Sequence, residues 1–242
     1  MIALGTINEI VRYPVKSMAG ERRAVTEIDW QGIEGDRQYG FVRRGNATRF
    51  PWFTGRDHSD LVRCRATYDD PEQPRRSTVT VRLPGGETVS LHDAGLRQTL
   101  EDASGQALDL VQLGIGAYDL MPVSIVTTAS LARLDLLHGA ALDRRRFRAN
   151  IVIDSDAAEA DWQGRRIRIG DAVDAPELLI AYPAPRCAMV TIDPDTGRRD
   201  ASVLRTVARE FGNVFCMYAS VARPGVAREG DRVRLVIEPA SL

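Results

Sequence analysis

The chain has 242 residues, of which 44% are hydrophobic, and a formal net charge of −1 at pH 7. This length allows one large domain or two smaller domains with cores of their own. The nearly neutral balance excludes a general attraction to nucleic acid or to an anionic membrane, although arginine is clustered locally, above all at residues 144–148.

The three cysteines, Cys64, Cys187 and Cys216, are far apart and form no C-x-x-C pair. This spacing argues against a disulfide framework and against a structural zinc site. The N-terminus lacks the apolar region of a secretory signal, and no apolar run approaches the ~20 residues of a membrane-spanning helix. We therefore expect a soluble, cytoplasmic protein without a membrane span or a nucleic-acid partner.

The first half of the chain is predicted to consist of short strands separated by glycine turns. Alternating apolar and polar residues at 6–15 predict a strand that ends near Pro14. Further strands are predicted at residues 23–30, 38–43, 61–68, 78–83 and 88–91. A helix is predicted at residues 94–103, with Asp93 as its N-cap and Gly105 near its end.

Two glycines and a proline interrupt the pattern at residues 113–122, and we place a domain boundary there, between residues 115 and 116. Strands are predicted at residues 123–128, 147–153, 165–169, 178–182, 188–192, 214–222 and 232–237. Helices are predicted at residues 130–138 and 203–211. Because strands dominate and do not alternate regularly with helices, the pattern indicates a mainly β fold with a few short helices (α+β), such as a barrel or sandwich.

Cys187 lies between Arg186 and an apolar run that ends in an Asp-Pro-Asp-Thr-Gly turn. As a free cysteine it could be a small buried hydrophobic residue, which is common for this residue type. It could also be a thiolate stabilised by Arg186, and then both a nucleophile and a soft metal ligand. The residues around Cys187 leave both interpretations open.

Cationic and polar side chains recur at predicted strand ends and turns. They are Lys16, Ser17, Arg37, Thr54, Arg56, Thr127, Thr128, Arg148 and Asn150. Arg148 and Asn150 are two residues apart in a predicted strand, so their side chains would share one face. Arginine, lysine and hydroxyl groups on one pocket would suit an oxygen-rich anion, typically phosphate, whereas each residue alone could be an ordinary surface position.

Five segments in order resemble the MOSC family, named after the molybdenum cofactor sulfurase C-terminal domain. They are YPVKS at 13–17, GDR at 35–37, TGRDHSDL at 54–61, RFRANIVID at 146–154 and PRCAMVTIDPDTG at 185–197. The resemblance covers residues 6–236 and is closest to the branch that includes the mitochondrial amidoxime reducing component and its bacterial relatives. It implies a MOSC-type β-barrel domain at 116–242, preceded by a smaller N-terminal β-barrel or sheet domain at 1–115.

The resemblance also implies a ligand, a molybdopterin carrying molybdenum. Cys187 matches the metal-binding cysteine, and Tyr218 matches a tyrosine near the cofactor. Residues at positions that hold the pterin and its phosphate are Lys16, Ser17, Arg37, Arg148 and Asn150, with Arg56 and Thr127 as further matches. Cys216 departs from the family pattern by replacing a glycine, which places a second thiol near the inferred pocket. Pyridoxal phosphate binding is also possible at the level of the family.

The implied function is a molybdenum-cofactor-dependent oxidoreductase that reduces N-hydroxylated compounds by two-electron removal of oxygen. Electrons would come from a separate flavin, iron–sulfur or haem protein, because no cluster of cysteines is present. An alternative is a sulfur carrier that uses a Cys187 persulfide, or a cofactor-binding protein without turnover. A third possibility is a degenerate domain kept for structure or partner binding.

Overall fold

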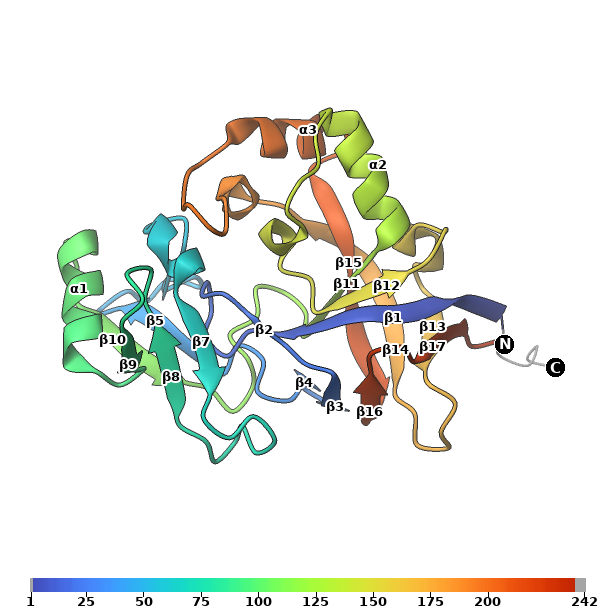
Figure 1. Ribbon diagram of the computed structural model, residues 1–242, viewed down its shortest axis with the longest axis horizontal. Coiled ribbons are helices and arrows are strands. Elements are labelled where there is room, and N and C mark those ends of the chain that lie inside the picture. Colours follow the sequence, from blue (N-terminus) through green and yellow to red (C-terminus); the bar gives the residue numbers. More distant parts are fainter. Residues whose placement is uncertain (1, 238–242) are drawn as a thin grey trace.

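Seven strands form a closed barrel in the computed structural model, which describes residues 2–237 (Figure 1). Their order is β12-β11-β15-β14-β13-β17-β1, and β1 pairs again with β12 to close the sheet. These strands are β1 (Ile2–Arg12), β11 (Val123–Thr127), β12 (Ile151–Asp154), β13 (Arg166–Ile169), β14 (Glu177–Pro185), β15 (Val214–Arg223) and β17 (Arg232–Leu235). β11 and β12 run parallel, whereas the other neighbours run antiparallel. The prediction of a mainly β fold with a barrel and a few short helices is confirmed.

The barrel encloses a core of β-branched and other aliphatic side chains. β13 shows the alternation that produces it, because Ile167 and Ile169 are fully buried while Arg166 and Arg168 face outward. Ile7 and Ile10 of β1 enter the same core. The N-terminal strand is therefore an integral part of a barrel made mostly from the second half of the chain.

A smaller unit lies beside the barrel and has its own core, with Phe41, Phe53 and Leu61 fully buried (Figure 1). One of its sheets consists of β5 (Tyr39–Arg43), β6 (Trp52–Phe53) and β10 (Leu108–Gln112), and the other of β7 (Arg65–Tyr68), β8 (Val79–Arg82) and β9 (Thr88–Ser90). Helix α1 (Ala94–Ser104) packs against β10. A further small sheet of β3 (Val25–Asp29), β4 (Gly32–Ile33) and β16 (Gly225–Arg228) joins the two halves of the chain, and β2 (Glu21–Arg22) pairs antiparallel with the end of β1.

The three predicted helices are present among residues 2–237. The N-cap residue of each helix determines where the helix begins. Asp93 accepts a hydrogen bond from the Leu96 amide at 2.9 Å, as expected for the N-cap of α1. α2 (Thr128–His138) and α3 (Ala201–Phe211) begin two residues earlier than predicted, because Thr127 and Asp200 cap them. Both helices lie over one end of the barrel (Figure 1). Within the described chain, no helix combines the length and apolar character needed to cross a membrane.

Three predicted strands are wrong in part, since each apolar run contains a 3-10 helix. The run at 188–192 forms a 3-10 helix at Ala188–Thr191, in which the Thr191 hydroxyl donates to the Ala188 carbonyl at 2.7 Å. The run at 61–68 begins with a 3-10 helix, Ser59–Arg63, and the run at 147–153 follows another, Arg144–Phe147. Short apolar runs do not distinguish strand from helix, and local side-chain hydrogen bonds decide the outcome.

Candidate cofactor site

A cavity of about 350 Å³ lies where the barrel meets the smaller unit. This volume falls in the range of about 300–1,000 Å³ that is usual for small-molecule sites. Eight of the nine predicted site residues line it: Lys16, Ser17, Arg37, Arg56, Arg148, Asn150, Cys187 and Tyr218. The fold thus brings together side chains from segments as distant as the loop after β1 and the middle of β15.

The cavity carries a strong excess of positive charge. Its cationic side chains are Lys16, Arg37, Arg56, Arg148 and Arg186, and its one lining carboxylate is Asp119. Arg186, which the sequence indicated as a partner for a Cys187 thiolate and not as a cofactor-binding residue, lines the same cavity. An excess of guanidinium groups in a recess favours a ligand with several anionic oxygens.

Arg148 is a buried cation of this cavity that the described residues satisfy only in part. Its Nη1 donates to the Met18 carbonyl at 2.7 Å, while its buried Nη2 has no hydrogen-bond partner among the described residues. Burial lowers the pKa of Arg148 to about 10, because the charged form is poorly solvated there. An anionic ligand in the cavity would supply the missing partner and the missing charge.

Arg37 and Asn150 form a rigid support beside Arg148. The Arg37 guanidinium donates to Asp36, to Asn150 Oδ1 at 3.2 Å and to the Arg148 carbonyl at 3.1 Å. Asn150 Oδ1 also accepts from the Ser124 amide at 3.2 Å, and its Nδ2 donates to the Val11 carbonyl at 3.1 Å. Asn150 therefore holds three segments together, and much of its amide capacity is already used within the fold.

The predicted geometry of the Arg148–Asn150 pair is wrong, although both residues reach the cavity. Arg148 has a φ of 53°, and strand β12 begins only at Ile151, so the two residues do not share the face of a strand. Ser17 and Arg37 also have positive φ, 69° and 52°. Three of the five non-glycine residues with positive φ in the described chain thus line this cavity, and such backbone strain often accompanies functional sites.

Lys16 is the one lysine of the sequence, and it is buried in this cavity. Its Nζ lies 2.5 Å from Asp119 Oδ1 and 2.6 Å from the Ala117 carbonyl, and burial lowers its pKa. The rings of Phe50 and Trp52 lie 5.6 and 5.5 Å from Nζ. Sequence reasoning missed Asp119, because the segment at 113–122 was interpreted only as a domain boundary.

Cys187 differs from the other two cysteines in its exposure. It immediately precedes the 3-10 helix Ala188–Thr191 and is partly exposed, whereas Cys64 and Cys216 are 4% and 3% exposed. Burial raises the thiol pKa of Cys64 to about 11 and that of Cys216 to about 12. Cys216 is absent from the cavity lining, so the interpretation of a cysteine as a buried hydrophobe suits Cys64 and Cys216 better than Cys187.

Arg186 precedes Cys187 in the chain and lines the same cavity, and the described residues satisfy its guanidinium group only in part. Its Nη2 donates to the Phe147 carbonyl at 2.7 Å, and its buried Nε has no partner in the described part of the chain. Tyr218 completes this wall, with its ring 5.8 Å from that of Tyr182, and burial raises the pKa of its phenol. The cavity that contains the thiol thus also contains a guanidinium group with spare hydrogen-bonding capacity.

Thr127 is the predicted site residue that the structure does not bring to the cavity. Its hydroxyl accepts from the Ser130 amide at 3.2 Å and donates to Glu159 Oε2 at 2.8 Å. These bonds cap α2 and satisfy Glu159, which is 3% exposed. Since its hydroxyl is used within the fold, we remove Thr127 from the candidate set.

Family models match almost the whole chain. The MOSC domain matches residues 115–234, and the MOSC N-terminal beta barrel domain matches residues 4–119. The two matched ranges meet in the segment that contributes Asp119 to the cavity.

Similar proteins fall into two groups. The mitochondrial amidoxime reducing component 2 of Bos taurus is 24% identical over 297 residues, covering 97% of this chain and 84% of that protein, and its Rattus norvegicus counterpart is 27% identical with the same coverage. A molybdenum cofactor sulfurase of Anopheles gambiae is 38% identical over 100 residues, and this match spans only 12% of the sulfurase. Among solved structures, the YuaD protein of Bacillus subtilis is 13% identical with a TM-score of 0.49, over 95% of this chain and 93% of that one.

Proposed function

Because the chain belongs to the MOSC family, we propose that it binds a molybdenum cofactor around Cys187 and reduces N-hydroxylated compounds. One observation carries the proposal: a partly exposed thiol shares a cavity with two arginines, Arg148 and Arg186, each of which has one buried nitrogen without a hydrogen-bond partner among the described residues. A thiolate is a soft ligand for a transition metal, and arginine binds phosphate oxygens in a bidentate manner. The metal and the phosphate of such a cofactor would each meet a matching group.

The donor set fits a metal that arrives with its own ligands. Among the described residues, no group of three or more histidine, cysteine, aspartate or glutamate side chains could hold a metal ion. A metal at Cys187 would therefore take its other ligands from the cofactor. The unpaired Arg148 Nη2 and Arg186 Nε would gain partners from its oxygens, which removes the cost of leaving buried donors unsatisfied.

Each residue then has a distinct role. Cys187 would bind the metal, while Arg148 and Arg186 would bind the anionic oxygens of the cofactor. Arg37 would position Arg148 by donating a hydrogen bond to the Arg148 carbonyl. The Lys16–Asp119 ion pair would form another part of the cavity wall. When bound, molybdenum would supply the redox chemistry by which an N–OH group, two electrons and two protons give N–H and water.

Tyr218 is our candidate for contact with the substrate. Burial raises its pKa, so the phenol stays protonated at neutral pH and can donate a hydrogen bond to a substrate oxygen. The two electrons would come from a separate redox protein. This part of the proposal is supported by the matches to two amidoxime reducing components along nearly the whole chain.

Reduction of benzamidoxime by the cofactor-loaded protein, with reduced methyl viologen as electron source, tests the proposed reaction. Cys187→Ala should abolish turnover while its circular dichroism spectrum and melting curve stay those of a folded protein. Arg76→Gln, which changes an exposed arginine outside the cavity, serves as the control. Undiminished turnover of Cys187→Ala would contradict the assignment.

A second function, sulfur transfer through a Cys187 persulfide, is favoured by the accessibility of this thiol and by the sulfurase matches. Mass spectrometry of the intact protein distinguishes it, since a persulfide adds one sulfur atom to Cys187 in a protein without stoichiometric molybdenum. Pyridoxal phosphate suits the cavity less well, because Lys16 Nζ, the amine available for an imine, is held by Asp119 and the Ala117 carbonyl.

A further inference from the structure

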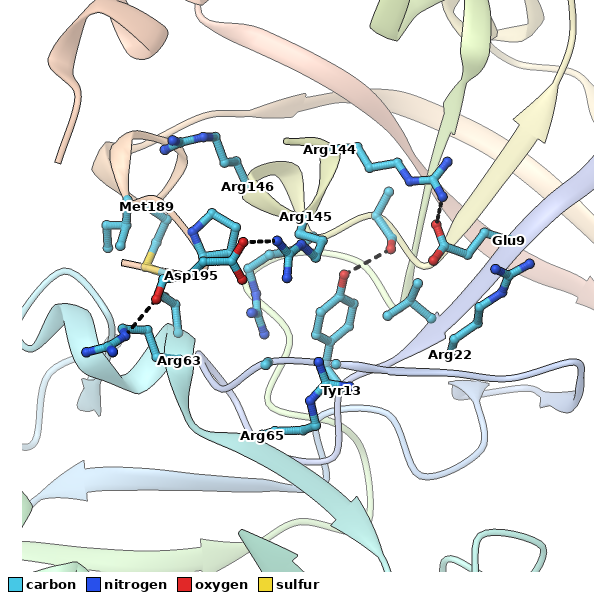
Figure 2. A pocket seen from close by; sticks show the side chains of 18 of the residues that line it. Glu9, Tyr13, Arg22, Arg63, Arg65, Arg144, Arg145, Arg146, Met189 and Asp195 are labelled. Carbon is cyan, nitrogen blue, oxygen red and sulfur yellow. Dashed lines mark hydrogen bonds and ion pairs between the residues drawn. The ribbon is translucent and has the colours of Figure 1, made fainter. Parts of the chain in front are cut away.

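A second cavity, of about 450 Å³, adjoins the cofactor cavity and has no place in the proposed reaction (Figure 2). We refer to it as the arginine cleft. It shares Arg148 and Met189 with the cofactor cavity, and it extends between β1, the β7–β8 pair and the segment at 144–149. Figure 2 shows Arg63, Arg65 and Arg144 arranged around it.

The arginine cleft is strongly cationic. Eight arginines line it: Arg22, Arg63, Arg65, Arg82, Arg144, Arg145, Arg146 and Arg148. Its lining carboxylates are Glu9 and Asp195. How much of this positive charge is available to a ligand depends on the ion pairs that these arginines make within the fold.

Several of these arginines are held by carboxylates of the fold. Arg144 pairs with Glu9 at 2.7 Å, and Arg145 pairs with Asp195 at 2.6 Å. Similar pairs fix Arg22, Arg63 and Arg146. These five guanidinium groups are already matched with negative charge, so they form a positioned frame around the cleft.

Arg65 and Arg82 are different. They face each other directly across the antiparallel β7–β8 pair. Their guanidinium groups make no ion pair or hydrogen bond within residues 2–237. Both side chains are exposed to solvent, which weakens their repulsion, but two like charges at opposed positions of a sheet are still unfavourable and no carboxylate in the described chain pairs with them. An anion bound between them would remove this repulsion.

The rest of the cleft is apolar. Side chains of Val11, Val62, Val126, Val152 and Ala149 line it. Small-molecule sites typically combine such an apolar lining with a few convergent polar groups, in volumes of about 300–1,000 Å³. A ligand with an apolar body and one anionic group matches both features.

We propose that the arginine cleft binds a small organic anion, with its carboxylate, phosphate or phosphonate between Arg65 and Arg82 and its apolar body against the valine-lined wall. This proposal is independent of the proposed reductase function, since it uses no residue of the cofactor cavity other than the shared Arg148 and Met189. The concave shape and the volume suit a small molecule.

Isothermal titration calorimetry of the full chain with phenylphosphonate tests the proposal. Two further probes are inorganic phosphate, which lacks the apolar ring, and benzyl alcohol, which lacks the anionic group. Phenylphosphonate should bind more tightly than either. The double variant Arg65→Gln/Arg82→Gln should weaken it at least tenfold, as loss of charged hydrogen bonds requires. Arg76→Gln, an exposed arginine outside both cavities, should leave it unchanged.

A second control separates the two cavities. Arg56→Gln changes an exposed arginine of the cofactor cavity alone. If this variant weakens phenylphosphonate binding and the double variant does not, the anion binds in the cofactor cavity and the proposal is overturned. Absence of binding, or equal affinity for inorganic phosphate, would overturn it as well. Should the double variant unfold, each single variant must weaken binding at least threefold.

Discussion

The guanidinium carbon of Arg148 lies 4.3 Å from the centre of the Tyr13 ring, and this contact lies at the wall between the two cavities. The Arg37 guanidinium contacts the same ring at 4.7 Å. The Tyr13 hydroxyl donates to the Ala149 carbonyl at 3.2 Å, which ties β1 to the segment that carries Arg148. Two cations thus share one aromatic ring, and Arg148 has no carboxylate partner among residues 2–237.

Replacing Arg148 by methionine should separate stability from cofactor binding. The buried charge destabilises the cofactor-free chain, as the lowered pKa of Arg148 indicates. Arg148→Met should therefore raise the free energy of unfolding of the cofactor-free protein by about 1 kcal/mol, measured by urea titration. It should also prevent retention of molybdenum. A variant that is destabilised and still retains the metal would contradict the assigned role.

Tyr13 should make the protein sensitive to alkaline pH. Burial raises its pKa to about 12, whereas an unfolded tyrosine titrates near pH ~10. Between these values the folded chain binds the proton more tightly than the unfolded chain, so the free energy of unfolding falls as pH rises. The loss should reach about 2–3 kcal/mol once the pH has risen through this interval.

Urea unfolding of the wild type and of Tyr13→Phe at pH 9, 10 and 11 isolates this effect from that of other groups. The free energy of unfolding of the wild type minus that of Tyr13→Phe should decrease as pH rises from 9 to 11. Below pH 9 this difference should be constant. A difference that stays constant across the whole series would show that Tyr13 does not titrate in this way.

Thiol reagents should distinguish the three cysteines. Cys187 is partly exposed, while Cys64 and Cys216 are buried and have raised pKa values of about 11 and about 12, so both remain protonated at pH 8. Iodoacetamide should modify one cysteine of the native cofactor-free protein, and peptide mapping should identify it as Cys187. Cys187→Ser should show no rapid modification. Rapid labelling of Cys216 would be inconsistent with the structure.

The opposed pair Arg65–Arg82 should be a source of instability. Removing one of two like charges across an antiparallel pair relieves their repulsion. Arg82→Gln should raise the melting temperature by about 1–2 °C at low salt. The gain should shrink at high ionic strength, because salt screens exposed charges. Arg76→Gln is the matched control. An equal rise in its melting temperature would show that the effect does not come from repulsion between Arg65 and Arg82.

Much of the fold was predictable from local patterns. The alternation of apolar and polar residues, as at Ile167 and Ile169, predicted strands of the barrel. Asp93, a typical N-cap residue, predicted the start of α1. The pattern did not indicate β10 (Leu108–Gln112), whose pairing with β5 supplies the stabilisation that its own sequence does not. It also placed β1 with the smaller domain, because the pairing of β1 with β12 and β17 depends on residues far away in the chain.

The candidate site was predictable through its motifs rather than through its geometry. Arg148 and Asn150 reach the cavity because of a positive φ and a network around Ser124, neither of which a strand pattern contains. Asp119 was missed because its role depends on contact with Lys16, more than a hundred residues away. Thr127 does not line the cavity, and the sequence could not reveal this, because a hydroxyl that caps a helix has the same sequence signature as one that binds a ligand.

The molybdenum content of protein purified from a host that makes the cofactor tests the central claim most directly. We expect about one molybdenum per chain for the wild type, as one thiolate ligand in one cavity implies. Cys187→Ala should contain almost none, and Arg76→Gln should match the wild type. A wild-type protein without molybdenum, or a Cys187→Ala variant that retains it fully, would contradict the cofactor site described above.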